Sequence, residues 1–180
     1  MTRQIALLRG INLGGHNRIA MPELTAVFVE LGCTRVATYL QSGNVVFDAK
    51  VTSSDLSRRI EEALKQRFDY AIPVITLTAA EFKLVTERNP FMSDKLDRRK
   101  LHVTFLAEAP SPELVKTIDP NLGGEDQWQA IGAAVYLYCP NGYGRTKLTN
   151  GLFERKFKTV ATTRNWQTVT NLLAMASADH

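Results

Sequence analysis

The sequence has few cysteines and no long apolar run. Only Cys33 and Cys139 occur among 180 residues, with no C-x-x-C pair, which excludes a disulfide framework and cysteine-based zinc sites. We expect both thiols to be reduced and buried, although one long-range disulfide is also compatible with two cysteines. No segment approaches the ~20 apolar residues of a membrane helix, and residues 5–8 are too short for a signal-peptide core. We therefore expect a cytoplasmic protein without a membrane partner.

Histidine is also scarce, and the common catalytic and nucleotide-binding motifs are missing. His16, His102 and His180 are far apart in the chain, so they predict no metal site, and we expect no bound cofactor. Neither the dinucleotide fingerprint G-x-G-x-x-G nor the P-loop G-x-x-x-x-G-K-[ST] occurs. Ser42 stands in Q-S-G-N rather than in the G-x-S-x-G of a nucleophile elbow. No motif therefore specifies a reaction.

The residues that are present have the composition of a globular protein with a small positive charge. Hydrophobic residues make up 44% of the chain and charged residues 22%, which excludes a disordered or fibrous protein. The formal net charge of +4 is compatible with an anionic partner but does not require one, because scattered lysines mainly keep a protein soluble.

The hydrophobic pattern of the first half predicts the order β-α-β-β-α-β. Strands are expected at 4–9, 35–40, 44–48 and 73–77, with a tight Ser42-Gly43 turn between the second and third. Helices are expected at 22–31, where Gly32 supplies the C-terminal cap, and from Ser53 to about residue 68. This order is the split βαβ pattern of ferredoxin-like folds.

The second half repeats this order after a short helix and a charged linker. Strands are expected at 101–106, 127–131, 134–139 and 160–163, and helices from 111, at 148–157 and from about 165. We predict an α+β protein of two ferredoxin-like subdomains packed together, with an extra C-terminal helix. The predicted boundaries are 1–78 for the first subdomain, 79–100 for the linker and 101–180 for the second subdomain.

Polar and glycine-rich residues gather at one edge of the first predicted sheet, the first edge. The first two strands of this topology run in the same direction, so the loop after the first strand should meet the turn between the second and third. Backbone N–H groups and a helix N-terminus would favour an anion there. The candidate ligand-binding residues are Arg9, Gly10, Asn12, Gly14, Gly15, His16, Arg18, Gln41, Ser42 and Asn44. The alternative is structural, because glycines allow turns and asparagines bond nearby backbone groups.

Basic residues gather at an edge of the second predicted sheet, the second edge. The topology places the loop at 141–147 beside residues 98–100 and 163–166. Six cationic side chains and two aromatic ones would meet there, which is typical of phosphate or nucleic-acid binding. The candidate ligand-binding residues are Tyr143, Arg145, Lys147, Arg164, Asn165 and Trp166. The alternative is a solvated basic rim, with the aromatic rings packed in the core.

Five short motifs resemble a bacterial protein family. They are L-L-R-G-I-N at 7–12, G-G at 14–15, T-Y-L-Q-S-G-N-V-V-F at 38–47, N-P-F at 89–91 and T-R-N-W at 163–166. In these motifs the sequence is similar to the family known as domain of unknown function 1697. The resemblance implies two α+β subdomains of ferredoxin-like character, and it implies no activity, substrate or catalytic residue. Members usually have lysines after the double glycine, where this chain has His16 and Arg18.

Three functions are compatible with these patterns. We hypothesise that the protein binds a phosphate-bearing ligand, a nucleotide or a nucleic acid, at its glycine-rich and basic loops. A second hypothesis is a small-molecule enzyme in which Ser42, His16 or a bound water reacts at the first edge. A third is a protein-interaction module whose edge strands pair with a partner.

Overall fold

Strands and helices alternate in two successive βαββαβ arrangements. The computed structural model describes residues 1–50 and 54–178, so the expected helix start at Ser53, as well as His180, lies outside the described residues. The first arrangement contains β1 (Thr2–Leu8), α1 (Met21–Glu30), β2 (Thr34–Tyr39), β3 (Asn44–Ala49), α2 (Ser54–Phe68) and β4 (Val74–Thr78). It is followed by α3 (Ala79–Glu87).

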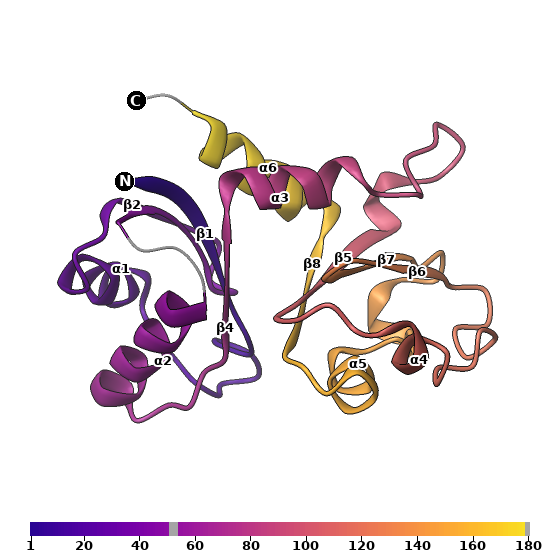
Figure 1. Cartoon of the computed structure of the whole chain (residues 1–180), viewed down its shortest axis with the longest axis horizontal. Coiled ribbons are helices and arrows are strands. Elements are labelled where there is room, and N and C mark those ends of the chain that lie inside the picture. The colour runs from indigo at the N-terminus through magenta and orange to yellow at the C-terminus, as the bar shows by residue number, and fades with distance from the viewer. Residues whose placement is uncertain (51–53, 179–180) are drawn as a thin grey trace. The chain divides into compact units, whose positions relative to one another are not determined.

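The strands of the first arrangement form an antiparallel sheet in the order β2-β3-β1-β4. One face of this sheet packs against α1 and α2, which lie together beside it in Figure 1. Leu24, Val27 and Phe28 of α1 share one helix face and are buried, as their spacing predicts. Phe28 meets Phe47 of β3 in an edge-to-face contact, with ring centroids 4.9 Å apart. The sheet strand order is that of a ferredoxin-like fold.

The second arrangement has the same topology. It contains the 3₁₀ turn η1 (Arg98–Lys100), β5 (Leu101–Leu106), α4 (Pro112–Val115), β6 (Gln127–Ile131), β7 (Ala134–Tyr138), the 3₁₀ turn η2 (Tyr143–Arg145), α5 (Asn150–Phe157), β8 (Ala161–Asn165) and α6 (Trp166–Ser177). Its antiparallel sheet has the order β6-β7-β5-β8. Residues of α5, among them Phe153 and Phe157, pack in a core with Val135 and Leu137 of β7. The fold is therefore α+β, with two similar subdomains and a C-terminal helix, as predicted.

Contacts between Cα atoms divide the chain into two compact units. One consists of residues 1–84 and the end of the chain from Asn171, and the other consists of residues 85–170. The two points of division lie within α3 and within α6. The boundaries at 78 and 100 that the sequence suggests stay a prediction.

Several element ends differ from the expectation. The loop between β2 and β3 has four residues, 40–43, because Leu40 leaves the strand with a φ of +57°. The helix expected from 111 is a single turn, α4, because the chain tightens after it: the Thr117 and Ile118 N–H groups donate three residues back, to the Leu114 and Val115 carbonyl oxygens. Helix α5 begins at Asn150 rather than 148, since Thr149 is its N-cap and accepts a hydrogen bond from the Leu152 N–H.

The two cysteines are free and buried, as predicted from their number and spacing. Burial raises the pKa of the Cys33 thiol and raises the pKa of Cys139 to about 11, which suppresses the nucleophilic thiolate form.

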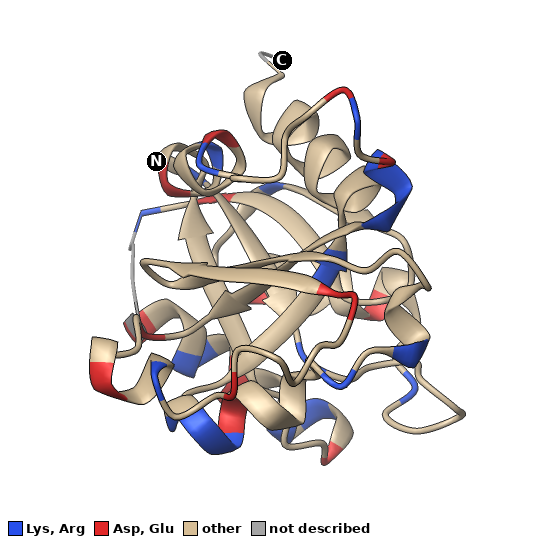
Figure 2. Ribbon diagram, turned by 90° about the vertical axis from the view of Figure 1, so that its right-hand side faces the viewer, with Lys and Arg blue, Asp and Glu red and all other residues tan. Residues whose placement is uncertain are grey.

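Among the described helices, none combines the length and the apolar character that crossing a membrane requires. Figure 2 shows acidic and basic residues interspersed along the ribbon.

Candidate functional site

The two loops of the first edge meet, as the topology predicts. The Asn12 side-chain Nδ2 donates to the Gln41 carbonyl oxygen at 2.8 Å. The Leu8 N–H donates to the Gly43 carbonyl oxygen, also at 2.8 Å. Segments thirty residues apart in the chain are therefore joined at the end of β1.

The asparagines of this edge bind the backbone of the chain itself. Asn12 Nδ2 also donates to the Ile19 carbonyl oxygen at 3.0 Å, and Asn12 Oδ1 accepts from the Ile19 N–H at 2.9 Å. Asn44 is fully buried, and its Nδ2 donates to the Tyr39 carbonyl oxygen at 2.8 Å and to Ser42 Oγ at 3.1 Å. These contacts favour the structural alternative for both asparagines.

Replacing Asn12 by alanine is expected to lower the free energy of unfolding by about 2 kcal/mol, because three hydrogen bonds are lost at roughly 0.5–1.5 kcal/mol each. Asn12→Asp keeps the acceptor for the Ile19 N–H but sets a carboxylate against the carbonyl oxygens of Ile19 and Gln41. We expect it to be destabilised as well, and less so at pH values that protonate the new carboxyl. Urea unfolding of both variants, repeated at lower pH for Asn12→Asp, measures these changes in the free energy of unfolding. A stability equal to that of the wild type would contradict the structural role.

The double glycine makes a tight turn. Gly14 and Gly15 have φ values of +56° and +82°, and the His16 N–H donates to the Leu13 carbonyl oxygen at 2.9 Å across them. Two successive positive φ angles are those of a type I′ turn, in which glycine is favoured at both positions. The turn leaves the His16 side chain exposed, and that side chain makes no hydrogen bond to a described residue.

A hollow of about 510 Å³ lies beside this turn. It is lined by Asn12, Gly15, Arg18, Ile19, Ala20, Glu23 and Gln41. The first turn of α1 adds little attraction for an anion, because Pro22 lacks an N–H and Glu23 already places a carboxylate there. Arg9 and Gly10 are half-buried at the end of β1, and Arg18 is exposed. The hollow at the first edge is thus lined by one exposed arginine, Arg18, and one carboxylate, Glu23, and the amide of Asn12 beside them is bonded to backbone groups.

The strand ends of the second edge also meet, as the topology predicts. His102 near the start of β5 pairs with Asn165 at the end of β8. The Cys139 N–H, just after β7, donates to the Lys100 carbonyl oxygen at 3.0 Å. Residues from the start of β5, the end of β7 and the end of β8 are therefore neighbours.

A cavity of about 480 Å³ opens at this edge, here called the η1–α6 pocket. It is lined by Arg98, Arg99, His102, Asn165, Trp166, Gln167 and Thr170. None of these described lining residues carries a carboxylate. The charged side chains that line the pocket are therefore all basic.

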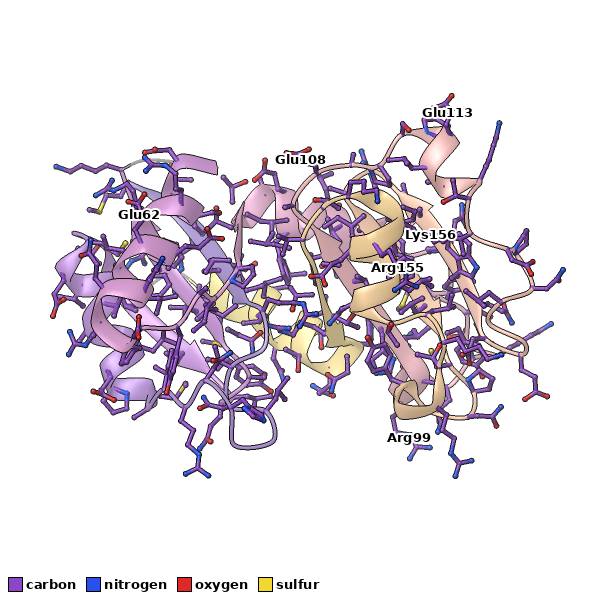
Figure 3. All side chains as sticks on the ribbon, turned by 90° about the horizontal axis from the view of Figure 1, so that it is seen from below. Glu62, Arg99, Glu108, Glu113, Arg155 and Lys156 are labelled. Atoms are coloured by element: carbon purple, nitrogen blue, oxygen red, sulfur yellow. The ribbon has the colours of Figure 1, made fainter. Side chains whose placement is uncertain are left out.

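The two arginines of η1 differ in their partners. Asp97 caps η1 by accepting from the Arg99 N–H, and the Arg99 guanidinium donates to the same carboxylate from Nε and Nη2 at 3.0 Å. These hydrogen bonds from Arg99 hold the pKa of Asp97 below its usual value. The Arg98 side chain makes no hydrogen bond or ion pair with any described residue, and only its carbonyl oxygen is bonded, to the Leu101 N–H. In Figure 3 Arg99 extends from the surface, well apart from Arg155 and Lys156 of α5.

Helix α6 begins at the wall of the pocket. Asn165 Oδ1 accepts from the Thr168 N–H at 2.8 Å and so caps the helix. Trp166, the first helical residue, is only 6% exposed, so little of its ring is accessible to a ligand. The first N–H groups of a helix have no partner within the helix, and in α6 the first two of them belong to the pocket-lining residues Trp166 and Gln167.

His102 is held between Tyr143 and the backbone. The two rings stack with centroids 4.8 Å apart, and His102 Nδ1 lies 3.3 Å from the Lys100 carbonyl oxygen. The Tyr143 hydroxyl donates to Thr163 Oγ1 at 3.1 Å, and Thr163 Oγ1 donates to Asn150 Oδ1 at 2.6 Å. Burial lowers the pKa of His102. This network fixes the orientation of both rings.

Only some of the candidate ligand-binding residues of the second edge line the pocket. Asn165 and Trp166 line it, and Tyr143 contacts one of its lining residues, His102. Arg145 and Lys147 are exposed and are not among the lining residues. Arg164 is buried, its Nη1 donates to Thr162 Oγ1 at 2.8 Å and to the Thr163 carbonyl oxygen at 3.0 Å, and burial lowers its pKa to about 10.

Sequence patterns do not predict His102, Gln167 and Thr170 as pocket residues. For His102, the polar pair His102 and Thr104 in an otherwise apolar strand is the available signal. The described residues contain no cluster of three or more His, Cys, Asp or Glu side chains that could hold a metal ion.

The two four-stranded antiparallel sheets define a class of α+β protein with two similar subdomains and a C-terminal helix. The profile of the family described as "Protein of unknown function (DUF1697)" matches residues 1–136, and the chain belongs to this family. A conserved bacterial protein from Streptococcus pneumoniae has a similar fold, with a TM-score of 0.77 and 23% identity over 98% of this chain and 99% of that one. No curated protein matches the chain.

Proposed function

We propose that the protein binds a small phosphate-bearing ligand of nucleotide size in the η1–α6 pocket. The observation that carries this proposal is Arg98, whose side chain has no partner among the described residues and lies in the wall of a cavity that is also lined by His102 and Trp166. A guanidinium presents paired N–H donors that match two phosphate oxygens, so it suits this group better than a lysine would.

The size and polarity of the pocket support a small ligand. Its volume of about 480 Å³ falls within the roughly 300–1,000 Å³ typical of small-molecule sites. A nucleic acid would instead require cations along an extended track, since most of its affinity comes from several phosphates. Arg145 and Lys147 are exposed cations that such a track could use, but they do not line the pocket.

The aromatic side chains support a base or another flat group beside the phosphate. His102 is stacked on Tyr143, and Trp166 lines the pocket beside it. Stacking of a base on an aromatic ring contributes about 1–3 kcal/mol and tolerates different bases. The pocket thus offers charge at η1 and aromatic rings next to it.

The first edge supports this function less well. Its two asparagines are bonded to backbone oxygens, and Glu23 would repel a phosphate from the hollow. The enzyme hypothesis at this edge also lacks geometric support, because the exposed His16 side chain makes no hydrogen bond to a described residue and so is not positioned as a base for Ser42.

Replacing Arg98 by alanine is expected to weaken the binding of adenosine 5′-monophosphate about 10- to 100-fold, because a hydrogen bond to a charged group contributes roughly 1.5–3 kcal/mol. Isothermal titration calorimetry measures the affinity, and thermal unfolding checks that the melting temperature is unchanged, since Arg98 is exposed.

Arg155→Ala is the matched control, because Arg155 is an exposed arginine of the same subdomain that does not line the pocket. It should bind like the wild type, and so should Arg18→Ala at the first edge. Equal affinity of Arg98→Ala and the wild type, or a loss in Arg18→Ala alone, would contradict the proposal. Tight binding of a single-stranded oligonucleotide with a steep salt dependence would indicate a nucleic-acid ligand instead.

A further inference from the structure

We infer that the η1–α6 pocket selects a phosphate monoester over a diester, and that His102 takes up a proton when the monoester binds. This inference rests on the proposed function and narrows it to one class of phosphate. It follows from the hydrogen-bonding state of the His102 ring, from the charges around it and from the number of acceptor oxygens that each class of phosphate offers.

The hydrogen-bond partner of His102 determines which ring nitrogen is available to a ligand. The Lys100 carbonyl oxygen can only accept, so His102 Nδ1, 3.3 Å away, must carry its hydrogen. In the neutral ring Nε2 is then an acceptor without a partner among the described residues, and it becomes a donor when the ring is protonated. Stacking on Tyr143 holds the ring in place in either state.

The charges near His102 oppose its protonation in the empty pocket. Three basic residues lie on η1, next to the start of β5: Arg98, Arg99 and Lys100. The other residues around His102 are uncharged at neutral pH; they are Asn165, Trp166, Gln167 and Thr170 from β8 and α6, and Tyr143 from η2. The nearby Asp97 carboxylate forms an ion pair with Arg99. Burial is the main cause of the lowered pKa of His102. The hydrogen bond to the Lys100 carbonyl oxygen offsets part of this effect, and the charge of Lys100 lowers the pKa further.

A phosphate monoester favours protonation of His102 more strongly than a diester does. With a second pKa near 6, a monoester is mostly a dianion at pH 7 and offers three acceptor oxygens, whereas a diester carries one charge and two free oxygens. Arg98, protonated Nε2 of His102 and the N–H groups of Trp166 and Gln167 at the start of α6 would provide donors for three oxygens. The second negative charge favours the imidazolium, so binding and protonation are linked.

The test compares adenosine 5′-monophosphate with its methyl ester, which differs only in having a diester, by isothermal titration calorimetry at pH 7.5 in buffers of different ionisation enthalpy. We expect the monoester to bind at least about tenfold more tightly and to take up between about half a proton and one proton. Lowering the pH from 8 to 7 should strengthen monoester binding several-fold, up to the tenfold limit for one linked proton.

Two histidine variants assign the proton. His102→Gln should abolish the uptake and most of the preference for the monoester, whereas His16→Gln, at an exposed histidine of the other subdomain, should change neither. Binding of both probes with equal affinity, or monoester binding without proton uptake, would overturn this inference and leave the proposed function intact. Absence of binding by both probes would overturn the proposed function itself.

Discussion

Replacing Asp48 by alanine is expected to lower the free energy of unfolding by about 3 kcal/mol, the lower end of the range for breaking a buried ion pair. The Asp48 side chain is 8% exposed and lies between two arginines, with Oδ2 2.5 Å from Arg35 Nε and Oδ1 3.4 Å from Arg3 Nη1. Arg3 is only 15% exposed and its buried Nε already lacks a partner, so the variant leaves a cation poorly solvated.

The matched control is Asp55→Ala. Asp55 also forms a pair with an arginine, Arg58, but both side chains are more than half exposed. Exposed pairs contribute little because water and salt screen them. Urea unfolding at neutral pH should therefore separate the two variants clearly, and equal stabilities would show that the Asp48 cluster is no stronger than a surface pair.

The contribution of Asp48 depends on pH with a definite sign. The hydrogen bond from Arg35 holds the pKa of Asp48 below its usual value in the folded protein, although burial alone would raise it. The unfolded chain therefore takes up a proton first, near its ordinary pKa of about 3.9. The stabilisation is complete above that pH and is lost as the pH falls toward the lower, folded-state pKa. The difference in stability between the wild type and Asp48→Asn should accordingly shrink between pH 5 and pH 2.5.

Gly43→Ala is expected to destabilise the protein by about 3 kcal/mol, through two independent effects. Gly43 has a φ of +84°, where any other residue is strained by about 1–2 kcal/mol. An added Cβ would also lie 2.7 Å from Leu8 Cβ and 3.0 Å from two side-chain atoms of Ile11, and overpacking of this kind costs about 1–3 kcal/mol.

Gly10→Ala separates these effects. Gly10 has a similar φ of +73°, but an added Cβ would meet no heavy atom within 4 Å. It should show the backbone strain alone, at about 1–2 kcal/mol. Thermal and urea unfolding of both variants measure the difference, and an equal loss in the two would show that the contacts with Leu8 and Ile11 relax without cost.

The first edge illustrates how far residue type can predict a site. Topology correctly predicts that the loop after β1 meets the loop between β2 and β3, because strand direction follows from the order of elements. It does not predict that Asn12 and Asn44 bond backbone oxygens, because an amide binds a carbonyl oxygen and a ligand equally well. Only the positions of Ile19 and Tyr39 decide between the two roles.

The second edge has the same limit for a charged residue. Strand alternation sets Arg164 on the sheet face of its partner Val103, opposite the face shared by His102 and Asn165. The sequence does not show whether the face that contains Arg164 and Val103 is covered by other elements. In the structure Arg164 is buried on that face. The basic cluster that the sequence suggested therefore loses one of its members and gains an unexpected histidine.

The sequence by itself determined the two βαββαβ arrangements and the family, because strand and helix periodicity record which side chains are buried, and short motifs are read directly. The tertiary structure alone decided which polar residues are available to a ligand. Hydrogen bonding within the chain occupies Asn12, Asn44 and Arg164, whereas Arg98 and His102 Nε2 keep donor or acceptor capacity beside a cavity. That difference depends on partners from distant segments, which local patterns do not encode.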